Sequence, residues 1–192
     1  IIDELGNNPD FQFMPVGKAG NISSYYKGYS AYKADNKIRE FPRLLGIQAE
    51  KSAPLVDNKI IEYPQTIASA IRIGNPASSS LEKEATTETN GQFLKVSDKE
   101  IIQAQSILAK EEGLFCEPAS ASSLAGFFKY IKSNNDYKGK KIVFILTGNG
   151  LKDPEVAEKY LKSEILQTSS KIQDISNAIT SGKSKGFFSK FF

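Results

Sequence analysis

In this 192-residue chain, the residue types and spacing at 11–22 indicate a chemical role most clearly. An apolar run at 11–16 ends in the loop Gly-Lys-Ala-Gly-Asn at 17–21, and apolar residues at helical spacing begin at Ile22. A glycine turn between a strand and a helix directs backbone N–H groups and the positive end of the helix dipole to one place. Because such a place suits a phosphate, the segment predicts a nucleotide or cofactor binder.

The same loop also fits a tight strand-to-helix turn that binds nothing. Its G-x-x-G spacing matches neither the dinucleotide fingerprint nor the G-x-x-x-x-G-K-[ST] loop of NTPases. Asn21 would be a good N-cap residue, with Ser23 and Ser24 as further hydroxyl groups in the first helical turn. Lys18 would either approach the phosphate or point into solvent, and we favour solvent.

Four other polar residues lie where a ligand could be contacted. Thr147 directly follows the apolar run 142–146, so its hydroxyl would either contact a ligand or satisfy backbone groups of the turn. Glu117 precedes a helical segment and would cap that helix or line a site, with capping favoured. Arg72 and Asn75 would contact an anionic substrate, or the arginine would form a surface salt bridge.

Composition excludes several kinds of site. The chain has no histidine and only one cysteine, Cys116, which excludes Ser–His or Cys–His catalysis, a disulfide and a Cys/His metal site within it. We interpret Cys116 as an inert core thiol. The 25 basic and 22 acidic residues are well mixed, and no apolar run reaches the roughly 20 residues of a membrane span. We therefore expect no metal, no nucleic acid and no membrane as partners.

Strand and helix signals alternate, which predicts a doubly wound, mostly parallel α/β sheet with helices on both faces. We expect strands at residues 11–16, 43–50, 92–96 and 142–146, the last buried on both faces because it is apolar and uncharged. Helices are expected at 22–32, 66–71, 78–88, 97–113, 119–131, 154–165 and 169–180. The capping box Ser97-Asp-Lys-Glu100 marks the start of one of them. Residues 1–5 should be the end of a helix stopped by Gly6, so the chain is expected to be a fragment.

Ligands of such sheets bind at the carboxyl ends of the strands. Loops 17–21, 117–120 and 147–150 are rich in small and polar residues, and we expect them to converge on one site. A dinucleotide is disfavoured, because Glu50 lies too far beyond Gly20 to match the acidic residue about 20 positions on in that fingerprint.

Taken together, five segments identify a family resemblance. They read PVGKAGNI at 15–22 with YKG at 26–28, QAE at 48–50 with AP at 53–54, TIA at 66–68 with AIRIGNP at 70–76, EEG at 111–113 with EPASA at 117–121, and LTGNGLKDP at 146–154. In this order and spacing they resemble threonine synthase, a pyridoxal-phosphate (PLP) family of the tryptophan-synthase-β type, or fold type II. The resemblance implies an N-terminally truncated PLP-binding large domain at 1–166. A C-terminal helix and a flexible basic and aromatic tail would follow at 167–192.

The resemblance also implies roles for individual residues. Thr147 would face the pyridine nitrogen of PLP, where a neutral hydroxyl would limit protonation of the ring. Asn149 stands where the family usually has histidine, and Lys18 where it usually has asparagine. The PLP phosphate would be held by the loop residues Gly17, Lys18, Ala19, Gly20 and Asn21.

In this family the lysine that forms the Schiff base lies upstream of the matched segments, so no catalytic lysine is expected here. The implied reaction converts O-phospho-L-homoserine and water to L-threonine and phosphate. Arg72, Asn75 and Glu117 are weaker substrate-binding candidates. A homodimer and a cytoplasmic or plastid location would accompany this activity. The alternatives are another fold type II lyase, such as a threonine or serine dehydratase or a cysteate synthase, and a non-catalytic binding domain.

Overall fold

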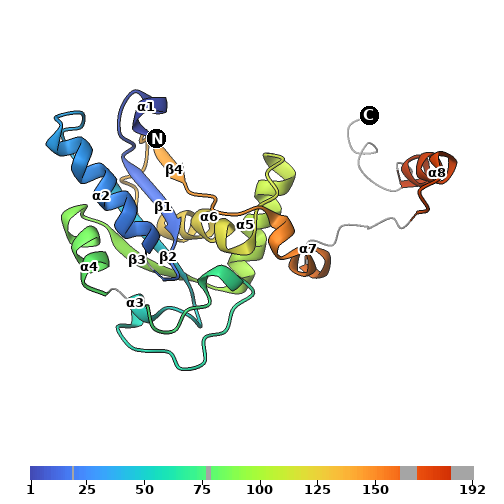
Figure 1. Cartoon of the computed structure of the whole chain (residues 1–192), viewed down its shortest axis with the longest axis horizontal. Coiled ribbons are helices and arrows are strands. Elements are labelled where there is room, and N and C mark those ends of the chain that lie inside the picture. Colours follow the sequence, from blue (N-terminus) through green and yellow to red (C-terminus); the bar gives the residue numbers. More distant parts are fainter. Residues whose placement is uncertain (19, 77–78, 161–167, 183–192) are drawn as a thin grey trace.

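The computed structural model describes residues 1–18, 20–76, 79–160 and 168–182. Its centre is one sheet of parallel strands in the order β3-β2-β1-β4 (Figure 1). The strands are β1 (Phe11–Pro15), β2 (Arg43–Ala49), β3 (Gln92–Val96) and β4 (Ile142–Phe144). All three pairings between neighbours are parallel, which confirms the predicted parallel α/β sheet.

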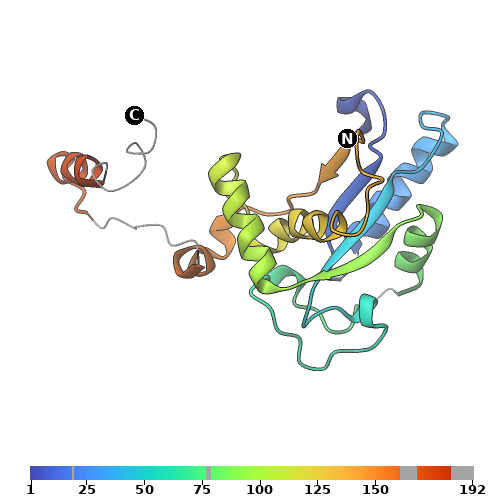
Figure 2. The ribbon, with the colours of Figure 1, turned by 180° about the vertical axis from the view of Figure 1, so that it is seen from behind.

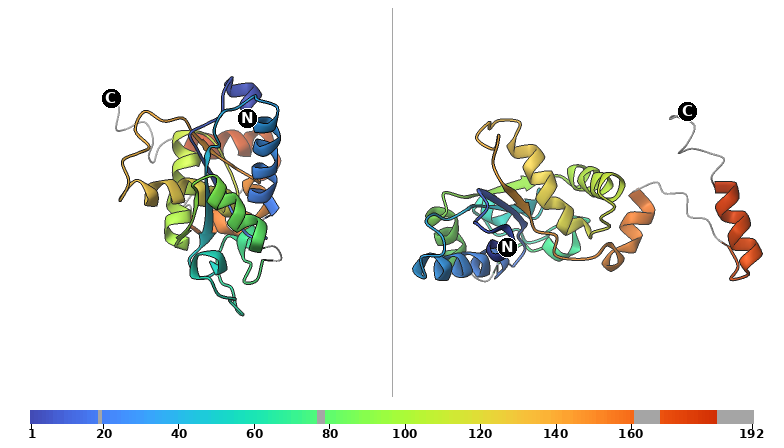
Figure 3. Two further views of the ribbon diagram at one scale, coloured as in Figure 1. Left: turned by 90° about the vertical axis from the view of Figure 1, so that its left-hand side faces the viewer. Right: turned by 90° about the horizontal axis from the view of Figure 1, so that it is seen from above.

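Helices cover both faces of this sheet. Figure 3 shows α2 and α4 on one face and α5 and α6 on the other, and Figure 2 shows the second face toward the viewer. The α-helices are α1 (Ile2–Leu5), α2 (Gly20–Ala34), α3 (Pro54–Asp57), α4 (Ser79–Glu88), α5 (Asp98–Glu111), α6 (Pro118–Tyr130), α7 (Pro154–Tyr160) and α8 (Ile172–Gly182). The described residues also form two 3₁₀ helices, η1 (Ser69–Ile71) and η2 (Gly150–Lys152).

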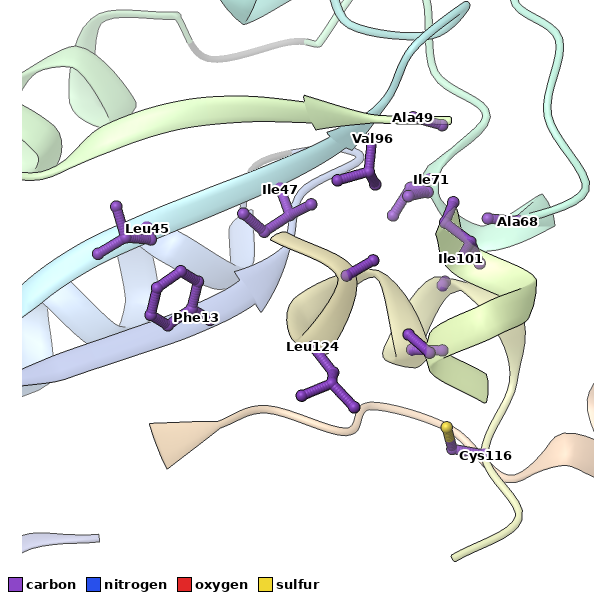
Figure 4. Packing of buried hydrophobic residues seen from close by; sticks show 14 of the residues in the cluster. Phe13, Leu45, Ile47, Ala49, Ala68, Ile71, Val96, Ile101, Cys116 and Leu124 are labelled. Atoms are coloured by element: carbon purple, nitrogen blue, oxygen red, sulfur yellow. The ribbon is translucent and has the colours of Figure 1, made fainter. Parts of the chain in front are cut away.

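The central strands β1 and β2 are buried on both faces because successive side chains point to opposite sides. Phe13 and Leu45 pack toward Leu124 of α6, in a cluster that also includes α5 (Figure 4). The next residue along β1, Met14, packs on the other face with Ile22 of α2. This double burial fixes β1 firmly, and with it the direction in which the loop after β1 leaves the sheet.

The expectation that the strand at 142–146 is buried on both faces is wrong. Strand β4 ends at Phe144, its three residues are only half-buried, and it lies at the edge of the sheet beside β1. Among the described residues no strand pairs with its outer edge. An apolar, uncharged run has the same appearance in sequence at an edge as at the centre, since its composition does not record its neighbours.

Most helix predictions are confirmed, with shifted ends. The capping box before α5 is formed, because Glu100 N–H donates to Ser97 Oγ at 3.3 Å and Ser97 N–H donates to Glu100 Oε2 at 2.8 Å. Gly6 and Gly113 have left-handed backbones at the ends of their helices, each with φ of 69°. Helix α2 begins at Gly20, two residues before the expected start, and residues 66–71 form only the 3₁₀ turn η1.

The C-terminal part is only partly described. Helix α7 is followed to Tyr160, so the expected continuation to 165 lies outside the described residues, as does the basic and aromatic tail at 183–192. Helix α8 starts at Ile172 instead of 169 and lies apart from the layers around the sheet in Figures 1 and 3. The division of the chain at 166/167 stays a prediction. No helix in the described ranges has the length and apolar character needed to cross a bilayer.

Candidate active site at the carboxyl edge of the sheet

Two of the predicted loops leave the same edge of the sheet from neighbouring strands. Phe13 of β1 pairs in register with Phe144 of β4, and Ile145 N–H donates to Phe13 O at 2.9 Å. Gly17 therefore follows β1, and Thr147 follows β4, only a few residues beyond the same rung of the ladder. This carboxyl edge is where parallel α/β sheets bind ligands.

The loop at 147–150 is joined directly to the start of α6. Ser120 Oγ accepts the backbone N–H of Thr147 at 2.8 Å and that of Gly148 at 3.0 Å. Glu117 N–H donates to Gly148 O at 3.0 Å. The predicted convergence of loops 117–120 and 147–150 is thus confirmed, and α6 fixes the backbone at the end of β4.

A buried carboxylate supports an exposed hydroxyl in this cluster. Thr147 Oγ1 donates to Glu117 Oε1 at 3.1 Å and lies 3.2 Å from Ser120 Oγ. Ser120 and Glu117 are buried, and Glu117 is only 2% exposed, whereas Thr147 is exposed. The arrangement holds one hydroxyl at the surface of the edge while its supporting groups are shielded from water.

Glu117 occupies the N-cap position of α6, but its side chain does not cap the helix. The favoured interpretation of Glu117 as a capping residue is therefore wrong. The Thr147 hydroxyl donates to the carboxylate instead, and the Lys152 ammonium forms an ion pair with it, 3.8 Å from Glu117 Oε2. Gly148 permits this geometry, since a Cβ there would lie 2.4 Å from Glu117 Oε1.

The glycine loop after β1 is packed against a different segment. A Cβ on Gly17 would lie 2.8 Å from Ala70 O and 3.1 Å from Ile71 Cα, so only glycine fits beside this backbone. Ser52 Oγ donates to Ile71 O at 3.0 Å and fixes the position of that segment. The loop conformation is therefore set by packing against residues 70–73.

The start of α2 is open. A Cβ on Gly20 would meet no atom of the described residues within 4 Å, and Lys18 is exposed, as favoured from the sequence. Ala19 lies outside the described residues. Backbone N–H groups in the first turn of a 15-residue helix lack intrahelical partners, so this opening has the character of an anion site.

Asn21 does not cap α2 as expected, because the helix already begins at Gly20. Instead its Nδ2 donates to Pro15 O at 3.1 Å and joins the helix to the end of β1. Its Oδ1 is buried and has no hydrogen-bond partner among the described residues. A buried amide oxygen that accepts no hydrogen bond is costly. We therefore expect a further group, a hydrogen-bond donor, to contact this atom.

Arg72 and Asn75 are both exposed. Arg72 Nε donates to Thr66 O at 3.0 Å, and no described carboxylate forms an ion pair with Arg72, so the interpretation as a surface salt bridge is wrong. The guanidinium is anchored at Nε by its own loop. Its two terminal nitrogens have no described hydrogen-bond partner.

Cys116 is 4% exposed, and burial raises its pKa to about 11. The thiol stays protonated at neutral pH, which confirms its interpretation as an inert core residue. The described residues contain no group of three or more potential side-chain ligands for a metal ion.

Sequence reasoning did not single out Ser120, which connects the two loops. A serine among the small residues of a helix gives no sign of its partner, and the contact joins positions 27 residues apart. The only signal was the placement of 117–120 and 147–150 as polar loops at one sheet edge.

Comparison with known proteins identifies the family. A family model described as "Pyridoxal-phosphate dependent enzyme" matches residues 1–148. The chain belongs to this family. The expected cofactor is therefore confirmed as that of the family, PLP.

Curated relatives give a narrower likeness. The chain is 46% identical to a threonine synthase of Bacillus sp. (strain ULM1) over 179 residues, which are 93% of this chain and 51% of that protein. It is 50% identical to the threonine synthase of Halalkalibacterium halodurans over 157 residues, 82% of this chain and 44% of that protein. The chain thus spans about half the length of the curated relatives it matches.

Solved structures support the fold. An L-serine ammonia-lyase from Rhizomucor miehei matches with a TM-score of 0.64 at 22% identity, covering 83% of this chain and 53% of that one. A serine racemase from Dictyostelium discoideum matches with a TM-score of 0.56 at 22% identity, covering 77% of this chain and 46% of that one. At these identities the likeness concerns the fold alone, a parallel sheet with helices around it.

Proposed function

We propose that this chain forms the PLP-binding half of a threonine synthase. The complete enzyme would convert O-phospho-L-homoserine and water to L-threonine and phosphate. The proposal is supported by curated relatives named threonine synthase at 46% and 50% identity. The observation that carries it is the exposed Thr147 hydroxyl, held by buried Glu117 and Ser120 beside the glycine loop on the adjacent strand.

The described residues fit both polar ends of PLP. The open start of α2 at Gly20 suits the phosphate, because N–H groups of the first turn and the helix dipole both favour an anion. Lys18 would place a positive charge near the phosphate, but phosphate binding would not require it. The unpartnered Asn21 Oδ1 is an acceptor, so a hydrogen-bond donor, and not the phosphate, would complete it.

Thr147 would contact the ring nitrogen. Bound PLP would act as an electron sink for carbanions that form on the substrate. The residues of this chain would hold the ring and the phosphate in place, and Thr147 would keep a hydrogen bond to the ring nitrogen. We assign the Schiff base to no lysine of this chain.

Arg72 is proposed to contact the anionic substrate. Its Nε is held by Thr66 O, so the guanidinium is positioned while its terminal nitrogens remain available to an anion. Asn75, three residues further along the chain, is also exposed and is proposed as a weaker contact. The homodimer and the cytoplasmic or plastid location belong to this proposal through the family resemblance.

The test is a product analysis on the full-length protein with PLP. Incubation with O-phospho-L-homoserine should release phosphate and threonine in equal amounts, and only when PLP is present. A dehydratase would instead release a keto acid and ammonia from threonine or serine. A folded, PLP-loaded protein that releases no phosphate from O-phospho-L-homoserine would overturn the proposal.

A further inference from the structure

The hydrogen bonds around Thr147 fix the direction of each proton in the cluster. Ser120 Oγ accepts two backbone N–H groups, those of Thr147 and Gly148, at 2.8 and 3.0 Å. A serine hydroxyl has two acceptor lone pairs, and both are used here. Toward Thr147 Oγ1, at 3.2 Å, Ser120 can therefore act only as a donor.

The same count applies to Thr147. Its Oγ1 lies 3.1 Å from Glu117 Oε1, and an ionised carboxylate only accepts hydrogen bonds. Lys152 Nζ lies 3.8 Å from Glu117 Oε2 and forms an ion pair with this buried group. Thr147 must then donate its single proton to Glu117. If the Ser120 proton turns instead to Gly148 O at 3.4 Å, the assignment at Thr147 is unchanged.

Glu117 has little freedom to leave this position. It is 2% exposed, and its carboxylate lies so close to Gly148 that any Cβ there would approach both oxygens, at 2.4 and 2.8 Å. The exposed side of Thr147 Oγ1 thus presents a lone pair and no proton. A ligand atom that contacts it must bring a hydrogen of its own.

We propose that Thr147 accepts a hydrogen bond from a protonated ring nitrogen of PLP, and that Glu117 is the positioning residue that imposes this direction. The inference rests on the proposed function, because it takes PLP as the ligand. It reverses the expectation that a neutral hydroxyl limits protonation of the ring. Through Thr147, the buried carboxylate stabilises a positive charge on the ring and so strengthens its action as an electron sink.

The test is ¹⁵N NMR of the full-length protein loaded with PLP that is labelled at the ring nitrogen. The wild-type signal at neutral pH should be that of a protonated pyridine nitrogen. In Glu117→Gln the amide can donate to Thr147, which frees the Thr147 proton for the ring. The pH at which the ring nitrogen titrates should then fall by at least about one unit, a roughly tenfold loss of the protonated form.

Two controls separate this role from a structural one. Thr147→Ser keeps the hydroxyl and should leave the ¹⁵N signal protonated. Glu100→Gln neutralises a carboxylate in the capping box of α5 and should not move the signal. Bound PLP with an unprotonated wild-type nitrogen would overturn the inference, and this result does not depend on whether a variant folds. An unchanged titration in PLP-loaded Glu117→Gln would also overturn it, whereas a folded wild type that binds no PLP would overturn the proposed function itself.

Discussion

Gly148 is where a single methyl group would disturb the candidate site most directly. In Gly148→Ala the added Cβ would lie 2.4 Å from Glu117 Oε1, so the buried carboxylate must move away from Thr147. We expect PLP affinity of the full-length protein to fall by about tenfold or more, since about 1.4 kcal/mol of lost interaction suffices for that. Titration of the apoenzyme with PLP, followed by absorbance, measures the effect.

Gly28→Ala is the matched control for this substitution. A Cβ at Gly28 of α2 would meet no atom within 4 Å, and alanine is the better helix former. The control should bind PLP as the wild type does and unfold at the same or a slightly higher temperature. Equal PLP affinity in Gly148→Ala and Gly28→Ala would contradict the role given to the Thr147–Glu117 contact.

Cys116 gives a prediction about pH. Burial raises the pKa of its thiol from 9.0 to about 11, so between these values the unfolded chain ionises while the folded one stays protonated. The native state should therefore lose stability as pH rises from about 9 to 11, by on the order of 1–2 kcal/mol. Urea unfolding of the full-length protein at several pH values measures this loss. Cys116→Ala should remove that part of the pH dependence, and an identical slope in both proteins would refute the assignment.

Individual residues show where sequence reasoning was sufficient. The glycine loop and Thr147 could be named as candidates because strand ends, glycines and family spacing are local features of the chain. The roles of Ser120 and Glu117 were missed because they depend on which distant partner supplies a donor. Glu117 resembles an N-cap in sequence, yet its carboxylate accepts a hydrogen bond from Thr147, 30 residues away.

At the scale of elements, the start of α5 is the best-defined local signal. Ser97→Ala removes the hydrogen bond from Glu100 N–H and should lower the free energy of unfolding by about 1 kcal/mol at neutral pH. Ser97→Thr keeps the capping oxygen and should cost clearly less. Urea unfolding of the full-length variants distinguishes the two, and equal losses would contradict the capping role.

The capping box also predicts the behaviour of Glu100. Partial burial raises the pKa of this carboxyl, but hydrogen bonds from Ser97 N–H and Oγ–H, with nearby Lys129 and Lys132, together lower it below its usual value. Its contribution to stability is therefore present above the unfolded pKa and is lost as pH falls through the folded pKa. The stability difference between Glu100→Gln and wild type should shrink on acidification.

Helices and strands were predicted well where the sequence has a periodic apolar pattern or a recognisable capping residue, as in the capping box of α5 and Gly113 at its end. Two features were not predicted. The apolar pattern of β4 did not reveal its position at the edge of the described sheet, because a strand's own sequence does not record which strands lie beside it. The start of α2 at Gly20 was placed too late, since packing of Gly17 against residues 70–73 sets the turn before it.

At the scale of the whole molecule, stability should be unevenly distributed. Strands β1 and β2 are buried on both faces, whereas α8 lies apart and Ile172 at its start is 86% exposed. Hydrogen exchange should therefore be slowest in β1 and β2 and fastest in α8. Limited proteolysis of the full-length protein should cut at 168–171 first and leave the unfolding temperature of the remainder unchanged. Protection of α8 equal to that of β1 would contradict this.

The central claim concerns the carboxyl edge between β1 and β4, and a crystal structure of the full-length protein with PLP tests it most directly. We predict that the ring nitrogen lies within hydrogen-bond distance of Thr147 Oγ1 and that the phosphate lies at the start of α2 beside Gly17 and Gly20. PLP bound elsewhere, or bound at this edge without contact to Thr147, would contradict the account.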